Sequence, residues 1–432
     1  MASRSYENSH EKNPPPATGT LAFWFGFFSI VFIVLLLKIS AQSYGSENIF
    51  FGIYSIVILV YILSRFFLSY LHRAVPESSA YEPSVCFVVP AKNEEDNIYE
   101  TILRFSEVEY PGDKIEVIAV NDGSTDGTLA EMRRAARDIQ GSVARVEVVD
   151  WEVNRGKRHG MHEGVRRSQS EVIIFVDSDS FIEPSSVRHL VKYFTNKEVG
   201  AVSGHTDVYN EGTNLLTRMQ ALRYYVSFKV YKAAESAFGT VTCAPGCCSA
   251  YRKEYLDEFI DEWLNQTFLG KGCTFGDDRS LTNFILRKYH AAYSSEAKAY
   301  TVVPDSFKKY MKQQQRWKKS WIRETFIASS FIWKKNPFAA AFFYVYLFLA
   351  FAAPFIFLRA VLWNPVLHGI LPIVYLFGLF LMLMLHGIYY RIHTGKPHWL
   401  FAVVGYWFFT VILMWQLPWA LFTVADTRWG TR

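Results

Sequence analysis

Uncharged apolar segments at both ends of the chain limit its fold more than any other feature. Five segments contain no Asp, Glu, Lys or Arg: Leu21–Leu37, Ile49–Ser64, Phe338–Leu358, Ala360–Tyr390 and His398–Ala425. A helix that crosses a bilayer needs roughly 20 apolar residues. The sequence therefore predicts two spans within residues 21–72, about three within 338–425, and a polar block, Arg73–Pro337, between them.

Basic residues beside these segments indicate the side on which the polar block lies. Arg65, Arg73, Lys334 and Lys335 flank the block, and such residues favour the cytoplasmic side of a membrane. Residues 1–20 are expected to be a disordered tail. Because a polar tail precedes the first span and no small-x-small cleavage motif precedes the second, we expect an uncleaved span rather than a signal peptide. The sequence predicts a multi-pass protein of the cell membrane with a cytoplasmic block.

Composition narrows the classes of function. Half of the 432 residues are hydrophobic and 17% are aromatic, which is too apolar for a disordered chain. The net charge of +5 is small for this length and gives no indication of a nucleic-acid partner. The five cysteines lie in the polar block at spacings unlike a zinc site, and we expect them to be reduced thiols.

Strand and helix patterns alternate in the first half of the polar block. The apolar runs expected to be strands are Val85–Val89, Ile115–Val120, Val143–Val149 and Val172–Val176. The segments with helical spacing between them are Glu94–Phe105, Thr128–Asp138 and Lys157–Arg167. This order predicts an α/β fold with a mostly parallel sheet and helices on its faces. In such sheets, ligands bind beyond the carboxyl ends of the strands.

The second half of the block is less regular. Asn214–Lys232 is predicted to be a long helix, and Cys243–Tyr251 a loop. Gly276 precedes a predicted helix at Ser280–Arg287. Ser306–Ile327, within residues 306–337, is amphipathic and combines basic residues with Trp, a pattern typical of helices at the membrane interface.

Polar side chains follow three of the predicted strands. They are Lys92, Asn93 and Glu94 after the first, Asp122 after the second, and Asp177 and Asp179 after the fourth. Residues i and i+2 of an extended chain point to the same side, so Asp177 and Asp179 could hold a divalent cation on a phosphorylated ligand. The alternative is an ordinary polar turn. Asp122 could accept hydrogen bonds from a base or ribose, or could cap the next helix.

Three more motifs carry chemistry, each with a plainer alternative. Asn154–Arg158 places three cations around a glycine, which suits a pyrophosphate or forms a solvated basic turn. The acidic pair Asp277-Asp278 could supply a general base for a sugar hydroxyl, or cap a helix. Gln313–Trp317 offers an arginine for a phosphate and a Trp face for a sugar ring, or is an interfacial anchor.

The order of these motifs resembles that of processive family-2 glycosyltransferases, the membrane synthases of hyaluronan, chitin oligomers and cellulose. The motifs are Asp122, Asp177-Ser178-Asp179, Gly276-Asp277-Asp278 and Gln313-x-x-Arg316-Trp317. The similarity is densest with bacterial hyaluronan synthases, and it includes Asn265–Gly270 and Trp429–Arg432. The resemblance implies a cytoplasmic GT-A-type domain over residues 73–305, inserted between membrane helices, that binds a nucleotide sugar.

The resemblance also implies roles for the donor side of the site. Lys92, Asn93, Glu94 and Asp122 would border the uridine. Lys157 and Arg158 would reach the diphosphate, which Arg316 would steady. Asp179, with Asp177 nearby, would hold Mg²⁺ or Mn²⁺. Trp429 and Arg432, in the tail at 426–432, would close over the nucleotide.

On the acceptor side, the resemblance implies that Asp278, beside Asp277, deprotonates the acceptor hydroxyl. Trp317 would stack the acceptor sugar, with Gln313 near it. The loop with Cys247 and Cys248 would also border the acceptor.

The resemblance leaves two kinds of product open. The expected reaction joins UDP-activated sugars into a β-linked polysaccharide that leaves through the protein's own channel across the bilayer. Hyaluronan, made from UDP-GlcNAc and UDP-GlcA, is the first expectation. The loop Ala244–Arg252 departs from the hyaluronan pattern toward the chitin-oligomer type, which uses one UDP-sugar. A transporter with a nucleotide-binding domain would explain the spans but not the four motifs.

The tail motif constrains the topology. If residues 1–20 are cytoplasmic, three spans after the polar block would leave Arg432 outside, away from UDP. A tail in the site needs an even number of crossings. The last two apolar segments contain four prolines that could divide them into more, or re-entrant, segments: Pro354, Pro365, Pro372 and Pro418.

Overall fold

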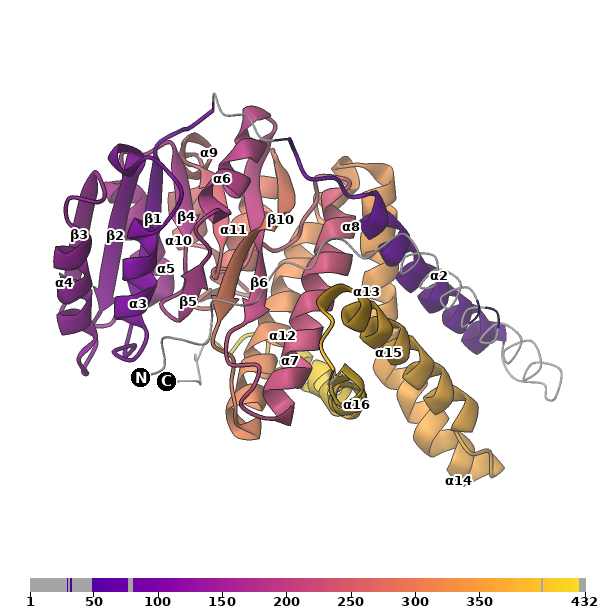
Figure 1. Ribbon diagram of the computed structural model, residues 1–432. Helices are drawn as coiled ribbons and strands as arrows, with labels where there is room; N and C mark the ends of the chain where they lie inside the picture. The colour runs from indigo at the N-terminus through magenta and orange to yellow at the C-terminus, as the bar shows by residue number, and fades with distance from the viewer. Residues whose placement is uncertain (1–28, 30–31, 33–48, 77–80, 398, 427–432) are drawn as a thin grey trace.

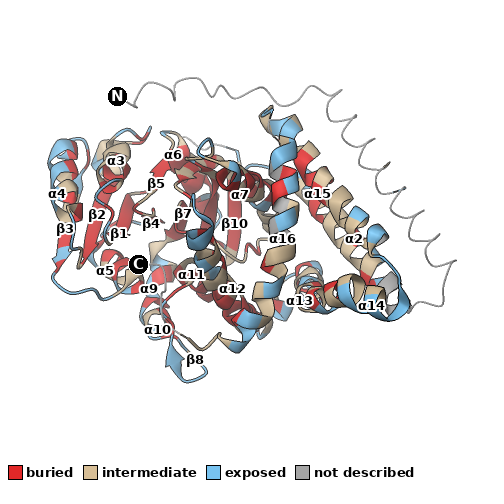
Figure 2. Ribbon diagram, turned by 90° about the horizontal axis from the view of Figure 1, so that it is seen from below, coloured by how far each residue is buried: buried red, intermediate tan, exposed pale blue. Residues whose placement is uncertain are grey.

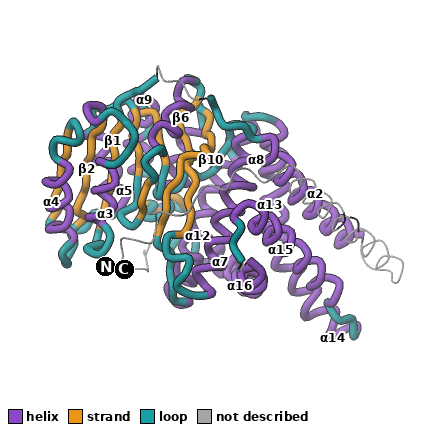
Figure 3. Tube along the Cα trace, in the orientation of Figure 1, coloured by secondary structure: helices purple, strands orange, loops and turns teal. Residues whose placement is uncertain are grey.

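The computed structural model describes residues 29, 32, 49–76, 81–397 and 399–426 (Figure 1). The predicted tail at 1–20, nearly all of the first predicted span, and Trp429 and Arg432 lie outside these residues. Figure 3 shows the strands gathered in one part of the described chain, with long helices extending from the other.

The largest element is an eight-stranded sheet in the order β3-β2-β1-β4-β7-β6-β10-β5. Its strands are β1 (Val85–Ala91), β2 (Ile115–Asp122), β3 (Arg145–Trp151), β4 (Val172–Phe175), β5 (Ser180–Ile182), β6 (Val199–Val208), β7 (Ser249–Arg252) and β10 (His290–Thr301). A separate hairpin joins β8 (Thr267–Phe268) to β9 (Lys271–Gly272). The four strands predicted from the sequence are β3, β2, β1 and β4, and they are parallel as expected.

The other half of the sheet makes it mixed. Strand β7 pairs antiparallel with both β4 and β6, and β5 pairs antiparallel with β10. The prediction of a loop over Cys243–Tyr251 holds only as far as Cys248, because Ser249–Arg252 enters the sheet between β4 and β6. The Gly and Cys residues at the start of this segment indicated a loop. The four residues of β7 are too few to show the alternating hydrophobic pattern of a strand.

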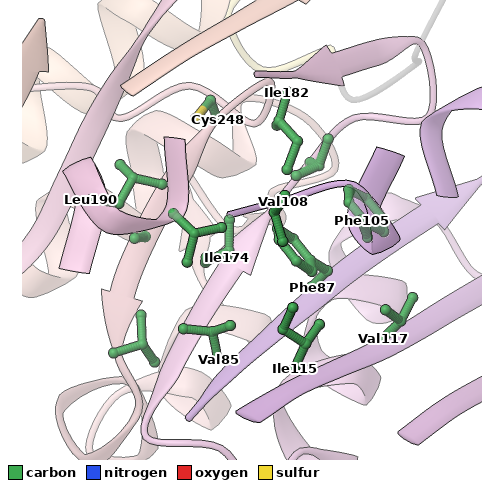
Figure 4. Close-up of a cluster of buried hydrophobic side chains, with 14 of the residues drawn as sticks. Val85, Phe87, Phe105, Val108, Ile115, Val117, Ile174, Ile182, Leu190 and Cys248 are labelled. Atoms are coloured by element: carbon green, nitrogen blue, oxygen red, sulfur yellow. The ribbon is translucent and has the colours of Figure 1, made fainter. Parts of the chain in front are cut away.

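Helices cover both faces of the sheet, and alternate side chains of β1 enter the two resulting cores. Val85 and Phe87 pack with α3 (Ile98–Leu103), α4 (Thr128–Ile139) and α6 (Ser186–Val191), in the core that Figure 4 shows. Cys86 and Val88 pack on the other face against α5 (Lys157–Arg167), α10 (Ile260–Leu264) and α11 (Asp277–Leu286). Figure 2 shows the central strands β1, β2, β4 and β6 buried and the β8 hairpin exposed. The buried strands give the site rigid support.

The remaining helices belong either to the sheet domain or to the apolar segments on both sides of it. They are α2 (Ile49–Leu71), α7 (Leu215–Val226), α8 (Ala233–Ser236), α9 (Lys253–Asp257), α12 (Phe307–Ser329), α13 (Pro337–Leu358), α14 (Asn364–His368), α15 (Ile373–Thr394) and α16 (Trp399–Phe422). Short 3-10 turns cover Arg104–Ser106, Gly112–Lys114, Lys192–Thr195 and Ile332–Lys334, and π-helical turns cover Ser227–Lys232 and Arg359–Trp363.

Three of the described helices are long and apolar enough to cross a membrane: Ile53–Leu71, Pro337–His368 and Tyr375–Thr394. A shorter apolar stretch, Val411–Phe422, lies in α16. Pro354 and Pro418 lie inside continuous helices, so neither divides its segment in two. These helices are consistent with an integral membrane protein.

Candidate active site

Strand register places the predicted polar clusters at one edge of the sheet. Ala91 pairs with Asn121, and Asp122 pairs with Trp151, so β1, β2 and β3 end together. Strand β4 pairs with β1 in the same direction, which brings Asp177 to this edge. Lys92 and Asp177 are 85 positions apart in the sequence. They nevertheless follow neighbouring parallel strands, β1 and β4.

The loops after β1 and β2 are tied to each other. Asn93 has a positive φ of 55°, and its side-chain Oδ1 accepts a hydrogen bond from the Thr125 N–H at 2.9 Å. The Glu94 N–H donates to Thr128 Oγ1 at 2.7 Å. These bonds fix the turn that contains Lys92. Its expected contact with uridine stays a prediction.

Asp122 is buried and holds the basic turn at residues 154–158. Its carboxylate accepts hydrogen bonds from Asn154 Nδ2 at 2.9 Å, the Arg155 N–H at 2.6 Å and the Gly156 N–H at 3.0 Å. Burial raises the pKa of Asp122, although these donors oppose the shift. Gly156 has φ +97°, a conformation that suits glycine. The carboxylate thus positions Lys157, the next residue, and its own contact with a base or ribose stays a prediction.

Asp177 and Asp179 lie directly beyond β4 and interact electrostatically. Burial, followed by the charge of Asp177, raises the pKa of Asp179 to about 6. Lys157 Nζ forms an ion pair with Asp177. A Cβ added to Gly246 would lie 2.6 Å from Asp177 Oδ1, so the loop after Cys243 passes directly over this carboxylate. Two close carboxylates whose repulsion a cation would relieve fit a divalent metal.

The described residues contain no group of three or more His, Cys, Asp or Glu side chains that could hold a metal ion. Among the described residues, Asp177 and Asp179 are the carboxylates that lie directly beyond β4. This set fits a hard cation that takes its other ligands from water or from a bound phosphate.

Asp277 and Arg158 form a buried ion pair. Arg158 Nε lies 2.9 Å from Asp277 Oδ1, and their side chains are only 3% and 5% exposed. Arg158 also donates to the Trp263 carbonyl and to Gln266 Oε1. Its guanidinium is thus held in the interior, so its predicted contact with a diphosphate has no support in this arrangement. Asp277 is engaged by the same pair, and its role beside Asp278 stays a prediction.

Asp278 faces the opposite way from its neighbour. Its Oδ1 accepts a hydrogen bond from the Arg279 N–H at 2.8 Å, and Cys243 Sγ lies 3.7 Å from its Oδ2. The side chain is partly exposed. Gly276 allows this arrangement, because it has φ +76° and a Cβ there would lie 1.8 Å from Ser320 Oγ of α12. The glycine therefore brings the start of α11 into contact with α12.

Helix α12 places Arg316 within electrostatic reach of both acidic pairs. Burial lowers the pKa of Arg316, while Asp277, Asp278, Asp177 and Asp179 act in the opposite direction. The charges of all four carboxylates named in the motifs therefore act on this one side chain.

The neighbours of Arg316 on α12 include the two residues predicted to border the acceptor, Trp317 and Gln313. Trp317 is 37% exposed, and its ring centroid lies 6.4 Å from that of Tyr224 on α7. Gln313 Oε1 accepts a long hydrogen bond of 3.5 Å from Gln314, which is anchored to Arg223. Gln313 is half-buried and Trp317 is partly accessible, and their contacts with a sugar stay a prediction.

The similarity of this chain to known proteins agrees with this geometry. Residues 86–260 match the family described as Glycosyl transferase family 2. A hyaluronan synthase from Streptococcus pyogenes is 30% identical over 411 residues, which cover 94% of this chain and 96% of the relative. The chain belongs to the family-2 glycosyltransferases. The predicted resemblance to bacterial hyaluronan synthases is confirmed, and the protein is a glycosyltransferase.

Two other comparisons describe the relatives of this glycosyltransferase. An N-acetylglucosaminyltransferase from Rhizobium meliloti is 34% identical over 271 residues, 62% of each chain. A mannosyltransferase from Pyrobaculum calidifontis, solved in complex with GDP-Man and Mn²⁺, has a TM-score of 0.57 at 21% identity. That likeness covers 87% of this chain and 99% of the other, and it confirms the predicted GT-A fold.

Cys248 does not lie in the acceptor site of this glycosyltransferase as predicted. It is fully buried in the core of Figure 4, where burial raises its pKa to about 12. Its neighbour Cys247 lies at the site, with Sγ 3.6 Å from Asp177 Oδ2. Adjacent residues of a chain entering a strand point to opposite sides, and this explains why only one thiol reaches the site.

Nothing in the sequence indicated the buried polar network that supports the acidic pair Asp277-Asp278. Gln266 Oε1 accepts from Ser280 Oγ at 2.6 Å as well as from Arg158, and Gln266 Nε2 donates to Glu324 at 3.3 Å. Glu324 is fully buried and pairs with Arg323, Nε to Oε1 2.8 Å. Gln266 lies in the segment Asn265–Gly270 that carried the resemblance, but its residue types gave no indication of a role in the network.

Proposed function

We propose that this glycosyltransferase polymerises UDP-activated sugars into a β-linked polysaccharide, and that the product is hyaluronan, built from UDP-GlcNAc and UDP-GlcA. The observation that carries the proposal is that one loop contacts both acidic pairs: Cys247 Sγ lies 3.6 Å from Asp177 Oδ2, and Cys243 Sγ lies 3.7 Å from Asp278 Oδ2. The similarity to a Streptococcus pyogenes hyaluronan synthase along 94% of the chain supports the choice of product.

On the donor side, Asp177 and Asp179 would hold Mg²⁺ or Mn²⁺ together with the diphosphate. The bound ion would offset the charge that develops on UDP as it leaves. Lys157 is the cation nearest to this pair, and its ion pair with Asp177 would open to admit the diphosphate. Arg316 supplies the second positive charge, and the buried Arg158 supplies none to the ligand.

On the acceptor side, Asp278 takes the proton from the attacking sugar hydroxyl. The bond from that oxygen to the donor C1 forms as the bond from C1 to the UDP oxygen breaks. In-line attack converts an α-linked donor to a β-linked product. Trp317 holds the acceptor ring by stacking, and Cys247 borders the same space.

The polysaccharide would leave through a channel formed with the apolar helices. The described chain ends beside α12, where Asp426 Oδ2 lies 3.3 Å from Lys319 Nζ. We infer that Trp429 and Arg432 reach the nucleotide from there. Protease accessibility in sealed vesicles tests this role, and an external C-terminus would contradict it.

A chitin-type oligomer made from UDP-GlcNAc alone is the second candidate. The loop Ala244–Cys248 favours it, as does the 34% identity to an N-acetylglucosaminyltransferase.

A donor panel distinguishes the two products. Purified protein in lipid with Mg²⁺ or Mn²⁺ is given UDP-GlcNAc, UDP-GlcNAc with UDP-GlcA, or UDP-glucose, and the product is sized and digested with specific hydrolases. Hyaluronan synthesis predicts polymer only from the mixture. Polymer or oligomer from UDP-GlcNAc alone would assign the second product, and no turnover with any donor would contradict both.

A further inference from the structure

Two thiols from one loop contact the two acidic centres of the site. Cys247 Sγ lies 3.6 Å from Asp177 Oδ2, and Cys243 Sγ lies 3.7 Å from Asp278 Oδ2. These distances are within the range of S–H···O hydrogen bonds, which are weaker than those of O–H and N–H donors. The Cys243 contact is the more informative, because it is made to the carboxylate that we assign as the base.

The two oxygens of Asp278 have different donors. Oδ1 receives the Arg279 backbone N–H at 2.8 Å, and Oδ2 faces the Cys243 thiol. The first donor belongs to the same helix turn and is always present. The second comes from a residue 35 positions earlier, so the orientation of the carboxylate depends on the placement of the loop.

The peptide group that joins Cys243 to Ala244 is anchored through both its carbonyl and its N–H. Lys232 Nζ, on the π-helical turn Ser227–Lys232, donates to the Cys243 carbonyl. The next N–H, of Ala244, donates to Thr282 Oγ1 at 2.9 Å, and Thr282 Oγ1 in turn donates to the Asp278 carbonyl at 2.7 Å. The loop is thus bonded to the same helical turn that carries Asp278. Turns with π geometry are frequent at functional sites.

The thiol stays protonated in this setting. Burial, and then the charge of Asp278, raises the pKa of Cys243 to about 11, against the opposing effects of Arg279 and Lys232. Cys243 is therefore a donor at neutral pH. Other titratable groups whose charges interact with that of Asp278 come from α5, β7 and α12: Lys157, Tyr251 and Arg316.

We propose that Cys243 is a positioning residue for the reaction: its thiol donates to Asp278 Oδ2 and holds the carboxylate in the orientation that receives the acceptor proton. The inference rests on the proposed function, since it takes Asp278 as the base. A donor to a carboxylate favours its ionised form. Removing the thiol therefore shifts the carboxylate toward its protonated form and lets it rotate about its side-chain bonds.

The test compares Cys243→Ala, which removes the donor, with Cys243→Ser, which keeps an O–H donor, using pH profiles of kcat/KM. We expect the acidic limb of Cys243→Ala to move to higher pH by about half to one unit, the effect of one hydrogen bond. Cys243→Ser should restore the parent limb. Cys273→Ala is the control, because Cys273 is a free thiol of the same domain whose charged neighbours are Arg323, Arg158, Glu324 and Asp277, whereas the thiol in contact with Asp278 is that of Cys243.

The outcomes separate this inference from the proposed function. An unchanged acidic limb in Cys243→Ala, or equal shifts in the Ala and Ser variants, would overturn the positioning role while Asp278→Asn remains inactive. Full turnover by Asp278→Asn would instead remove the base on which the inference rests. Equal thermal midpoints of the parent and the two Cys243 variants show that a shift does not come from loss of folding.

Discussion

Arg158 of α5 and Asp277 of α11 form an ion pair between residues 119 positions apart, with Nε and Oδ1 separated by 2.9 Å. Both side chains are almost fully buried. The pair joins the parallel half of the sheet domain to the helix that carries Asp278. It therefore fixes where Asp278, the proposed base, lies relative to Asp177 and Asp179.

Breaking this pair should destabilise the protein strongly. Arg158→Met or Asp277→Asn leaves one buried partner without its counter-charge, which costs about 3–5 kcal/mol. Thermal unfolding in detergent, followed by loss of the folded monomer peak, measures the effect. Glu163→Gln is the control, because Glu163 pairs with Arg167 on the exposed surface of α5 and should cost less than about 1 kcal/mol. If Glu163→Gln lowered the free energy of unfolding as much as Arg158→Met or Asp277→Asn, the structural role of the pair would be contradicted.

The contact of α11 with α12 at Gly276 should not tolerate a side chain. In Gly276→Ala the new Cβ would lie 1.8 Å from Ser320 Oγ and 2.6 Å from Ser320 Cβ, at a φ of +76°. We expect loss of activity and a lower thermal midpoint.

Gly141→Ala separates the two causes, because Gly141 has φ +94° and nothing within 4 Å of the added Cβ. It should cost only the backbone strain, about 1–2 kcal/mol. Ser320→Gly should partly rescue Gly276→Ala. If Gly276→Ala were no worse than Gly141→Ala, the close contact between the helices would be wrong.

The repulsion between Asp177 and Asp179 should make the metal-free site unstable. Asp179→Asn removes one of two interacting charges, so its thermal midpoint in EDTA should exceed that of the parent. Adding Mn²⁺ with UDP should stabilise the parent and leave Asp179→Asn almost unchanged, because a ligand stabilises only the state that binds it. Stabilisation of the variant equal to that of the parent would place the cation elsewhere.

His205 should make the stability of the fold depend on pH. It is 1% exposed, and burial lowers its pKa, with Asp207 opposing and Lys229 and Lys298 adding to the shift. The unfolded chain therefore binds a proton below about pH 6.5 that the folded protein does not, so the free energy of unfolding falls as the pH drops.

The thermal midpoint of the parent, measured from pH 8 to pH 5, should decline, and His205→Gln should decline less. His290→Gln, at a 42% exposed histidine of β10, is the control and should follow the parent. A His205→Gln profile that matched the parent would show that another group causes the decline.

Local patterns in the sequence predicted the half of the fold that has parallel strands. Val172–Val176 is a short apolar run that forms β4, and Lys157–Arg167 matches α5 because Gly156 and Ser168 bound it. The antiparallel half depends on contacts distant in sequence. Ser249–Arg252 is a strand because β4 and β6 lie on either side of it, and four residues show no period of their own.

The sequence indicated which residues border the site but not the direction in which each side chain points. Asp177 and Asp278 both contact thiols of one loop, Cys247 and Cys243. Arg158 and Cys248 have suitable chemistry for a ligand, but the fold turns both side chains into the interior. The sequence pattern does not distinguish Lys157 from Arg158. Only the packing of α5 decides that the Lys157 side chain reaches Asp177 and that the Arg158 side chain is buried.

The central claim is that Asp278 is the base of a glycosyl transfer in which Asp177, Asp179 and Arg316 hold the donor diphosphate. The most direct measurement is the turnover of Asp278→Asn, followed as UDP release from the active donor set, together with its affinity for UDP. The account predicts that turnover falls about 100-fold or more while UDP binding stays within a factor of two or so of the parent. Full turnover by Asp278→Asn, or loss of UDP binding in step with activity, would contradict it.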